Sequence, residues 1–169
     1  MFRTLWNALV HRPLGEPIPA ADAEMAAMAR ALDGAARRRL GRSLSLRLVD
    51  AGSCNGCELE LNALSNPFYD LERFGLRFVA SPRHADVLLI TGPVTKTMRE
   101  ALLRTHEAMP APKWVVAVGD CAVCGGIFAG SYACEAGAAA VLPVDLRIPG
   151  CPPSPAQMLA GLLALMDGG

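Results

Sequence analysis

The sequence predicts an α/β domain built on a mostly parallel β-sheet with helices on both faces. From residue 43 onward, short apolar segments alternate with segments of helical periodicity, which is the pattern of a parallel sheet whose strands are joined by helices. Residues 87–90 form a continuous apolar run, as expected of a strand buried on both faces. The chain has 169 residues, of which 52% are hydrophobic, so one domain can bury a substantial core.

The expected elements follow one another along the chain. Residues 43–49 alternate between apolar and polar side chains, which indicates a strand. Pro110 ends the helix expected before it, while Ser154 and Pro155 supply the cap and the first position of the last helix. The predicted strands are 43–49, 76–80, 86–91, 113–119 and 145–148. The predicted helices are 20–40, 58–64, 97–109 and 155–166.

Residues 1–42 are predicted to form an N-terminal basic arm, followed by the sheet domain at 43–169. The arm contains seven arginines and four carboxylates, so its net charge is +3 and the rest of the chain carries −3. Residues 13–19 contain three prolines and are expected to be an extended linker before helix 20–40. The arginines at 37–39 either stabilise the helix end or form a docking patch for a partner or anionic lipid. We expect the arm to dock on partner subunits.

Charge and hydrophobicity indicate which classes of partner the protein has and where in the cell it lies. The formal net charge is zero, so nothing overall attracts nucleic acid and we expect no nucleic-acid partner. Only 19% of the residues are charged, which predicts that part of the surface is covered in an assembly. No apolar run approaches the ~18 residues of a spanning helix, and the start of the chain does not resemble a secretory signal. We therefore expect a peripheral protein on the cytoplasmic side of a membrane.

Six cysteines are too few for a disulfide scaffold in a chain of this length, so we expect ligands or free thiols. Cys54, Cys121 and Cys151 each come just after a predicted strand, and Cys57 completes a Cys-x-x-Cys pair with Cys54. Ligands of open parallel sheets bind beyond the carboxyl ends of the strands, so these cysteines are expected to meet at one edge. Four thiolates suit a tetrahedral metal ion or an iron–sulfur cluster.

The choice of ligands leaves an alternative open. Cys124 forms a second Cys-x-x-Cys pair with Cys121, so a zinc site could use Cys124 in place of Cys151. We favour Cys151 because Gly150 and the prolines at 152–153 frame a stiff ligand loop. Cys124 is then a spare thiol, and Cys134 is expected to be a small buried residue.

Two glutamates follow the first cysteine pair. Glu58 is expected to stabilise the start of helix 58–64, where carboxylates are favoured. Glu60 lies deeper in an apolar segment. For Glu60, the same helix-stabilising role and a role in proton transfer coupled to electron flow are both open.

Three motifs carry a resemblance to one protein family: GSCNGCELE at 52–60, GDC at 119–121 and PVDLRIPGCPP at 143–153. Over residues 44–166 the chain resembles the 20-kDa subunit of respiratory complex I and the small subunits of membrane-bound nickel–iron hydrogenases. The resemblance implies a flavodoxin-like fold and one [4Fe–4S] cluster held by Cys54, Cys57, Cys121 and Cys151. It also implies electron transfer to or from a large subunit, which would contain the catalytic nickel–iron site of the oxidoreductase complex.

The spacing of the first two cysteines indicates the branch of this family. The complex I subunit typically has adjacent cysteines at the first ligand position, whereas Asn55 and Gly56 separate Cys54 from Cys57 here. This spacing is similar to the hydrogenase branch that includes formate hydrogenlyase and energy-converting hydrogenases. That branch implies ferredoxin-like and membrane subunits as further partners. The alternatives are a quinone-reducing complex I-type subunit and a zinc-stabilised scaffold module with no redox role.

Overall fold

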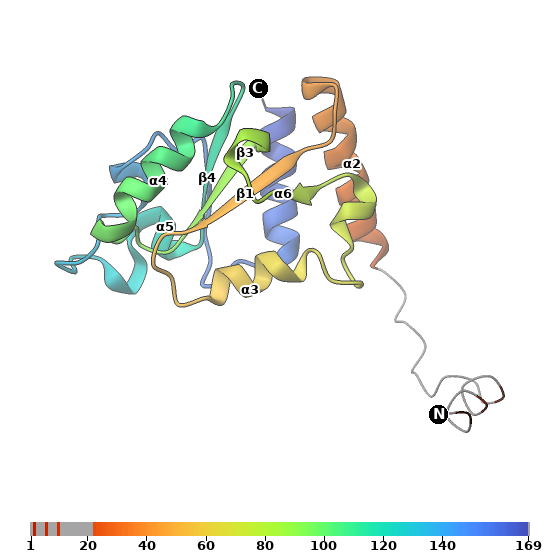
Figure 1. Ribbon diagram of the computed structural model, residues 1–169, viewed down its shortest axis with the longest axis horizontal. Coiled ribbons are helices and arrows are strands. Elements are labelled where there is room, and N and C mark those ends of the chain that lie inside the picture. The colour runs from red at the N-terminus through yellow and green to blue at the C-terminus, as the bar shows by residue number, and fades with distance from the viewer. Residues whose placement is uncertain (1, 3–5, 7–9, 11–21, 169) are drawn as a thin grey trace.

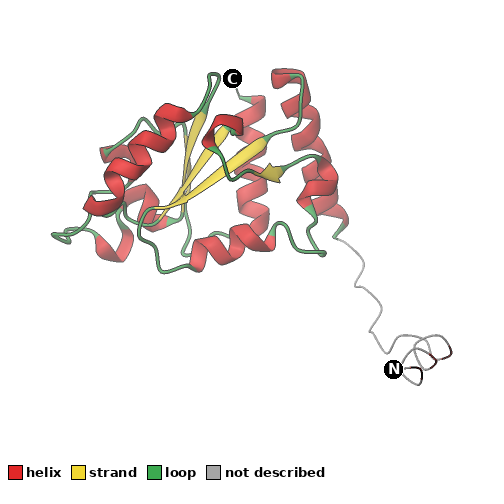
Figure 2. Cartoon of the chain, viewed as in Figure 1, coloured by secondary structure: helices red, strands yellow, loops and turns green. Residues whose placement is uncertain are grey.

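The chain folds as a parallel sheet between two layers of helices (Figures 1 and 2). The structure is a computed structural model that describes residues 22–168 together with Phe2, Trp6 and Val10. The linker predicted at 13–19 lies outside the described residues. No helix in the described part of the chain is both long enough and apolar enough to cross a membrane.

The sheet has a flavodoxin-like strand order. Its strands pair in the order β2-β1-β3-β4-β5, and all four pairs are parallel. All five residues of β3 are buried, as its apolar sequence predicts. The predicted fold class is therefore confirmed. The strands are β1 (Ser45–Asp50), β2 (Arg77–Phe78), β3 (Val87–Thr91), β4 (Trp114–Val118) and β5 (Leu146–Ile148).

Helices cover both faces of the sheet (Figure 1). Neighbouring residues of a strand point to opposite faces, so Leu89 of β3 packs with α2, α3 and α6, whereas Leu88 packs on the side of α4 and α5. The predicted helices are present with shifts of at most three residues at either end. The α-helices of residues 22–168 are α2 (Ala23–Leu40), α3 (Gly56–Ala63), α4 (Lys96–Ala108), α5 (Asp120–Cys124) and α6 (Pro155–Asp167).

Helix α2 packs into the main core of the sheet domain. Leu32 is fully buried in the same cluster as the apolar residues of α6. Arg39 donates a hydrogen bond to the carbonyl oxygen of Leu165 at 2.7 Å, and Arg38 pairs with Asp167 at 3.1 Å. The third arginine of this helix end, Arg37, pairs with Asp33 at 2.8 Å, so all three are paired within the chain. The arm boundary predicted at residue 42 stays a prediction.

Two elements differ from the sequence-based expectation. The strand predicted at 76–80 is limited to Arg77–Phe78, because the chain leaves the edge of the sheet and turns into a 3-10 helix at Pro82–His84. Helix α5 has only five residues, too few to show a helical repeat in the sequence. Cys121 therefore lies in the first turn of a helix.

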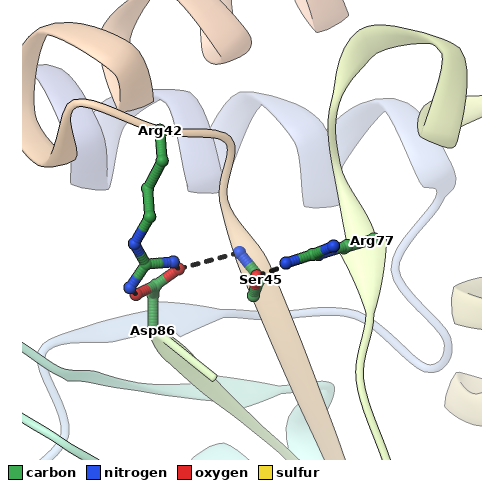
Figure 3. Close-up of polar contacts among 4 residues, drawn as sticks. All are labelled: Arg42, Ser45, Arg77 and Asp86. Atoms are coloured by element: carbon green, nitrogen blue, oxygen red, sulfur yellow. Dashed lines mark hydrogen bonds and ion pairs between the residues drawn. The ribbon is translucent and has the colours of Figure 1, made fainter. Parts of the chain in front are cut away.

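An ion pair fixes the amino-terminal edge of the sheet (Figure 3). Asp86, just before β3, is 1% exposed, and its carboxylate oxygens accept hydrogen bonds from Arg42 at 2.8 and 2.5 Å. The same carboxylate accepts from the backbone N–H of Ser45 at 2.9 Å. Arg77 donates to the Ser45 hydroxyl at 3.3 Å. These contacts hold the starts of β1, β2 and β3 together.

Arg42→Met is expected to lower the free energy of unfolding by about 2–3 kcal/mol, because it leaves the buried Asp86 carboxylate without its counter-charge. The loss stays below the ~3–5 kcal/mol of a fully buried pair since the Arg42 side chain is 50% exposed. Urea unfolding followed by circular dichroism measures it. As a control, Arg104→Met breaks an exposed pair with Glu100 and should cost less than about 0.5 kcal/mol. Equal losses in the two variants would contradict this expectation.

Candidate metal centre

Three loops at the carboxyl edge of the sheet bring four cysteines around one cavity. Cys54 and Cys57 follow β1, Cys121 follows β4 and Cys151 follows β5; we call these four residues the cavity cysteines. The loop from β1 to α3 runs along the lower edge of the molecule in Figure 1. The cavity has a volume of about 90 Å³. It is also lined by Ser53, Gly56, Gly92, Asp120, Gly150 and Pro152.

The first loop is shaped by side-chain oxygens that accept backbone hydrogen bonds. Oδ1 of Asp50 accepts from the N–H groups of Gly52 and Ser53 at 2.8 and 2.7 Å. The Ser53 hydroxyl accepts from the N–H of Asn55 at 2.9 Å. Asn55 has a φ of 70°, a left-handed conformation that asparagine tolerates better than most residues. Asn55 therefore suits the turn that starts α3 between the two cysteines.

The loops after β4 and β5 continue the pairing of these strands. The N–H of Gly119 donates to the carbonyl oxygen of Ile148 at 2.8 Å, and Asp120 and Gly150 exchange two hydrogen bonds of 2.8 Å each. A Cβ atom added at Gly119 would lie 2.5 Å from Sγ of Cys57. The loop after β4 therefore contacts both of the other cysteine loops.

Glu58 is buried beside the cavity cysteines, with 6% of its surface exposed. Its carboxylate accepts hydrogen bonds from the hydroxyl of Ser53, at 2.5 Å, and from that of Thr91. Glu58 thus links the first cysteine loop to the end of β3. Glu60 is half-buried on α3 and is not among the described residues that line the cavity, so its role in proton coupling stays a prediction.

The cavity cysteines influence one another electrostatically. Burial raises the pKa of the Cys57 thiol to about 11, together with the charges of Glu58, Cys121, Cys54 and Cys151. The pKa of Cys121 is also raised, first by burial and then by Cys151 and Cys54. At neutral pH these two thiols therefore carry protons in the metal-free protein, and binding of a cationic centre would release them.

The remaining cysteines lie apart from the cavity. Cys124 is exposed and its thiol donates to the carbonyl oxygen of Asp120 at 3.3 Å, while Cys134 is partly buried. Neither is among the described residues that line the cavity. Within residues 22–168, no group of three or more His, Cys, Asp or Glu side chains is close enough together to hold a single metal ion.

Comparison with known proteins identifies the family. Residues 54–165 match the protein family described as NADH ubiquinone oxidoreductase, 20 Kd subunit. The matched segment includes all four cavity cysteines. The chain belongs to this family. Membership in the 20-kDa subunit family was expected from the three cysteine motifs and is confirmed.

Two curated relatives place this 20-kDa family member in the predicted branch. The chain is 45% identical over 148 residues to formate hydrogenlyase subunit 7 of Escherichia coli, covering 87% of this chain and 56% of that protein. It is 44% identical over 128 residues to the probable membrane-bound hydrogenase subunit mbhJ of Pyrococcus furiosus, covering 76% and 77%. The chain thus spans little more than half the length of the first relative.

Solved structures agree with the fold of the 20-kDa family. A chain of the membrane-bound sulfane sulfur reductase, an archaeal respiratory membrane complex, superposes with a TM-score of 0.67 at 37% identity, covering 81% of this chain and 74% of that chain. A chain of an NAD+-reducing [NiFe]-hydrogenase superposes with a TM-score of 0.60 at 21% identity, covering 75% and 93%. The second likeness concerns the fold alone.

Proposed function

We propose that the protein is an electron-transfer small subunit that carries one [4Fe–4S] cluster in a membrane-associated oxidoreductase complex of the [NiFe]-hydrogenase type. The observation that carries this proposal is the meeting of four thiols from three loops around one cavity. The whole cavity, which four sulfur-bearing residues help to line, has a volume of about 90 Å³. The cavity cysteines would hold the irons, and the bound cluster would supply a one-electron redox couple.

A partner subunit is proposed to cover the cavity. Cys54 and Cys151 are exposed in the isolated chain, and large apolar side chains are exposed nearby. The exposed Leu59 lies two residues after Cys57 on α3. The exposed Ile127 lies beside Cys121, because the backbone of Ile127 donates a hydrogen bond to the Cys121 sulfur. Exposed apolar surface of this kind is typical of protein interfaces. The large subunit of the complex would dock here, with the chain peripheral on the cytoplasmic side of the membrane.

The likeness to the sulfane sulfur reductase favours a second candidate. In it, the protein passes electrons through the same cluster within a respiratory complex that does not act on hydrogen. The two candidates differ in the large subunit rather than in this chain. A nickel–iron site in the partner would require two Cys-x-x-Cys pairs there, and their absence would favour the second candidate.

The cluster can be tested directly. The full chain, purified without oxygen, is expected to contain about four irons and four acid-labile sulfides. Its visible absorption should bleach with dithionite, and the reduced protein should give an electron paramagnetic resonance signal. Zinc content is measured on the same samples. Stoichiometric zinc without labile sulfide would overturn the proposal and favour the scaffold module.

A further inference from the structure

Asp120 joins two of the three cysteine loops. Its backbone N–H donates to the carbonyl oxygen of Gly150 at 2.8 Å, and the N–H of Gly150 donates back to Oδ1 of Asp120 at 2.8 Å. One of these two bonds is made by the main chain alone and depends on no side chain. The other depends on the carboxylate and, being charge-assisted, is the stronger type.

The two bonded residues directly precede two cavity cysteines. Asp120 precedes Cys121, and Gly150 precedes Cys151. A change in the separation of Asp120 and Gly150 therefore moves both sulfurs relative to each other. Asp120 also lines the cavity, and its carboxylate lies 2.8 Å from the N–H of the residue that precedes Cys151, so its charge is close to the cysteines.

We propose that Asp120 is a positioning residue of the metal centre, which holds the Cys121 and Cys151 loops together and lowers the reduction potential of the bound cluster by its negative charge. This inference rests on the function proposed above, because it requires the cluster. The physical reason is that adding an electron beside a fixed negative charge is unfavourable, more so where water is partly excluded.

Two substitutions separate the hydrogen bond from the charge. Asp120→Asn keeps an oxygen that can accept from Gly150 and removes the charge. It should retain wild-type iron and shift the reduction equilibrium about tenfold toward the reduced cluster, a positive shift of about 59 mV for one electron. Asp120→Ala removes both the side-chain hydrogen bond and the charge. This variant should show the same shift in potential and should also lose iron to a ferrous chelator several-fold faster than the wild-type chain. Redox titration followed by electron paramagnetic resonance measures the potential.

Asp145→Asn is the matched control. Oδ2 of Asp145 accepts from the N–H of Val115 at 2.7 Å, so this carboxylate also joins β5 to β4, but at the far end of both strands from the cysteines. It should leave the potential and the iron release unchanged. A shift of equal size in this control would overturn the proposal, because the effect would then not be local.

Further outcomes decide the inference. A wild-type potential in Asp120→Asn, or wild-type iron release in Asp120→Ala, would overturn it. If Asp120→Ala does not fold, the potential of Asp120→Asn decides alone. A wild-type chain without iron and sulfide would instead contradict the proposed function, so the two failures are distinguishable.

Discussion

Replacing any one of the cavity cysteines with serine is expected to reduce the iron of the anaerobically purified chain from about four atoms to fewer than one. Each thiolate would hold one iron, and a serine hydroxyl stays protonated at neutral pH and is a poor substitute for a soft thiolate. Iron and acid-labile sulfide assays on the four variants measure the loss. The variants should keep the circular dichroism of the wild-type chain, because serine is nearly as large as cysteine and Cys57 is the only cavity cysteine that packs against the described core.

The other two cysteines provide the controls. Cys124→Ser and Cys134→Ser should retain the full iron content, since neither residue lines the cavity. Comparing Cys124→Ser with Cys151→Ser decides between the two ligand sets that the sequence leaves open. Loss of metal in Cys124→Ser with retention in Cys151→Ser would show that the alternative set is the correct one.

The sheet was predictable because each strand carries its own signal. The apolar runs at 87–90 and 114–118 predict burial on both faces, and the structure places them in the interior strands β3 and β4, where all of these residues are buried except the partly buried Trp114. Helix α6 begins at Pro155, with the capping interaction of Ser154 that its sequence predicts. Helix α5 was not predictable, since its start depends on the unusual backbone of Gly119, which no periodicity reveals.

The candidate site was predictable only in part. The cysteines could be assigned to one edge because each follows a strand, and parallel strands share their carboxyl edge. The hydrogen bond between Glu58 and Thr91 and the one between Asp120 and Gly150 could not be predicted. In each pair the two residues are at least 30 positions apart in the chain. Hydrogen-bond partners so far apart in the sequence can be identified only from the three-dimensional arrangement of the loops.

Gly119→Ala is expected to disrupt the metal centre without replacing any ligand. Gly119 has φ 86° and ψ 157°, a conformation that is essentially restricted to glycine and costs other residues about 1–3 kcal/mol. The added Cβ would also lie 2.5 Å from Sγ of Cys57, so the sulfur or the loop after β4 has to move. We expect the iron content of the purified chain to fall at least threefold and its unfolding midpoint in urea to fall.

Gly130→Ala separates the contact with sulfur from the cost of the backbone. Gly130 also has a positive φ, of 79°, but a Cβ there would meet no heavy atom of the described residues within 4 Å outside its chain neighbours. This variant should lose about 1 kcal/mol of stability and keep its iron, because only the left-handed backbone is penalised. If Gly119→Ala kept as much iron as Gly130→Ala, Cys57 would not lie against the loop after β4. The contact that joins the first cysteine loop to the loop after β4 would then have to be abandoned.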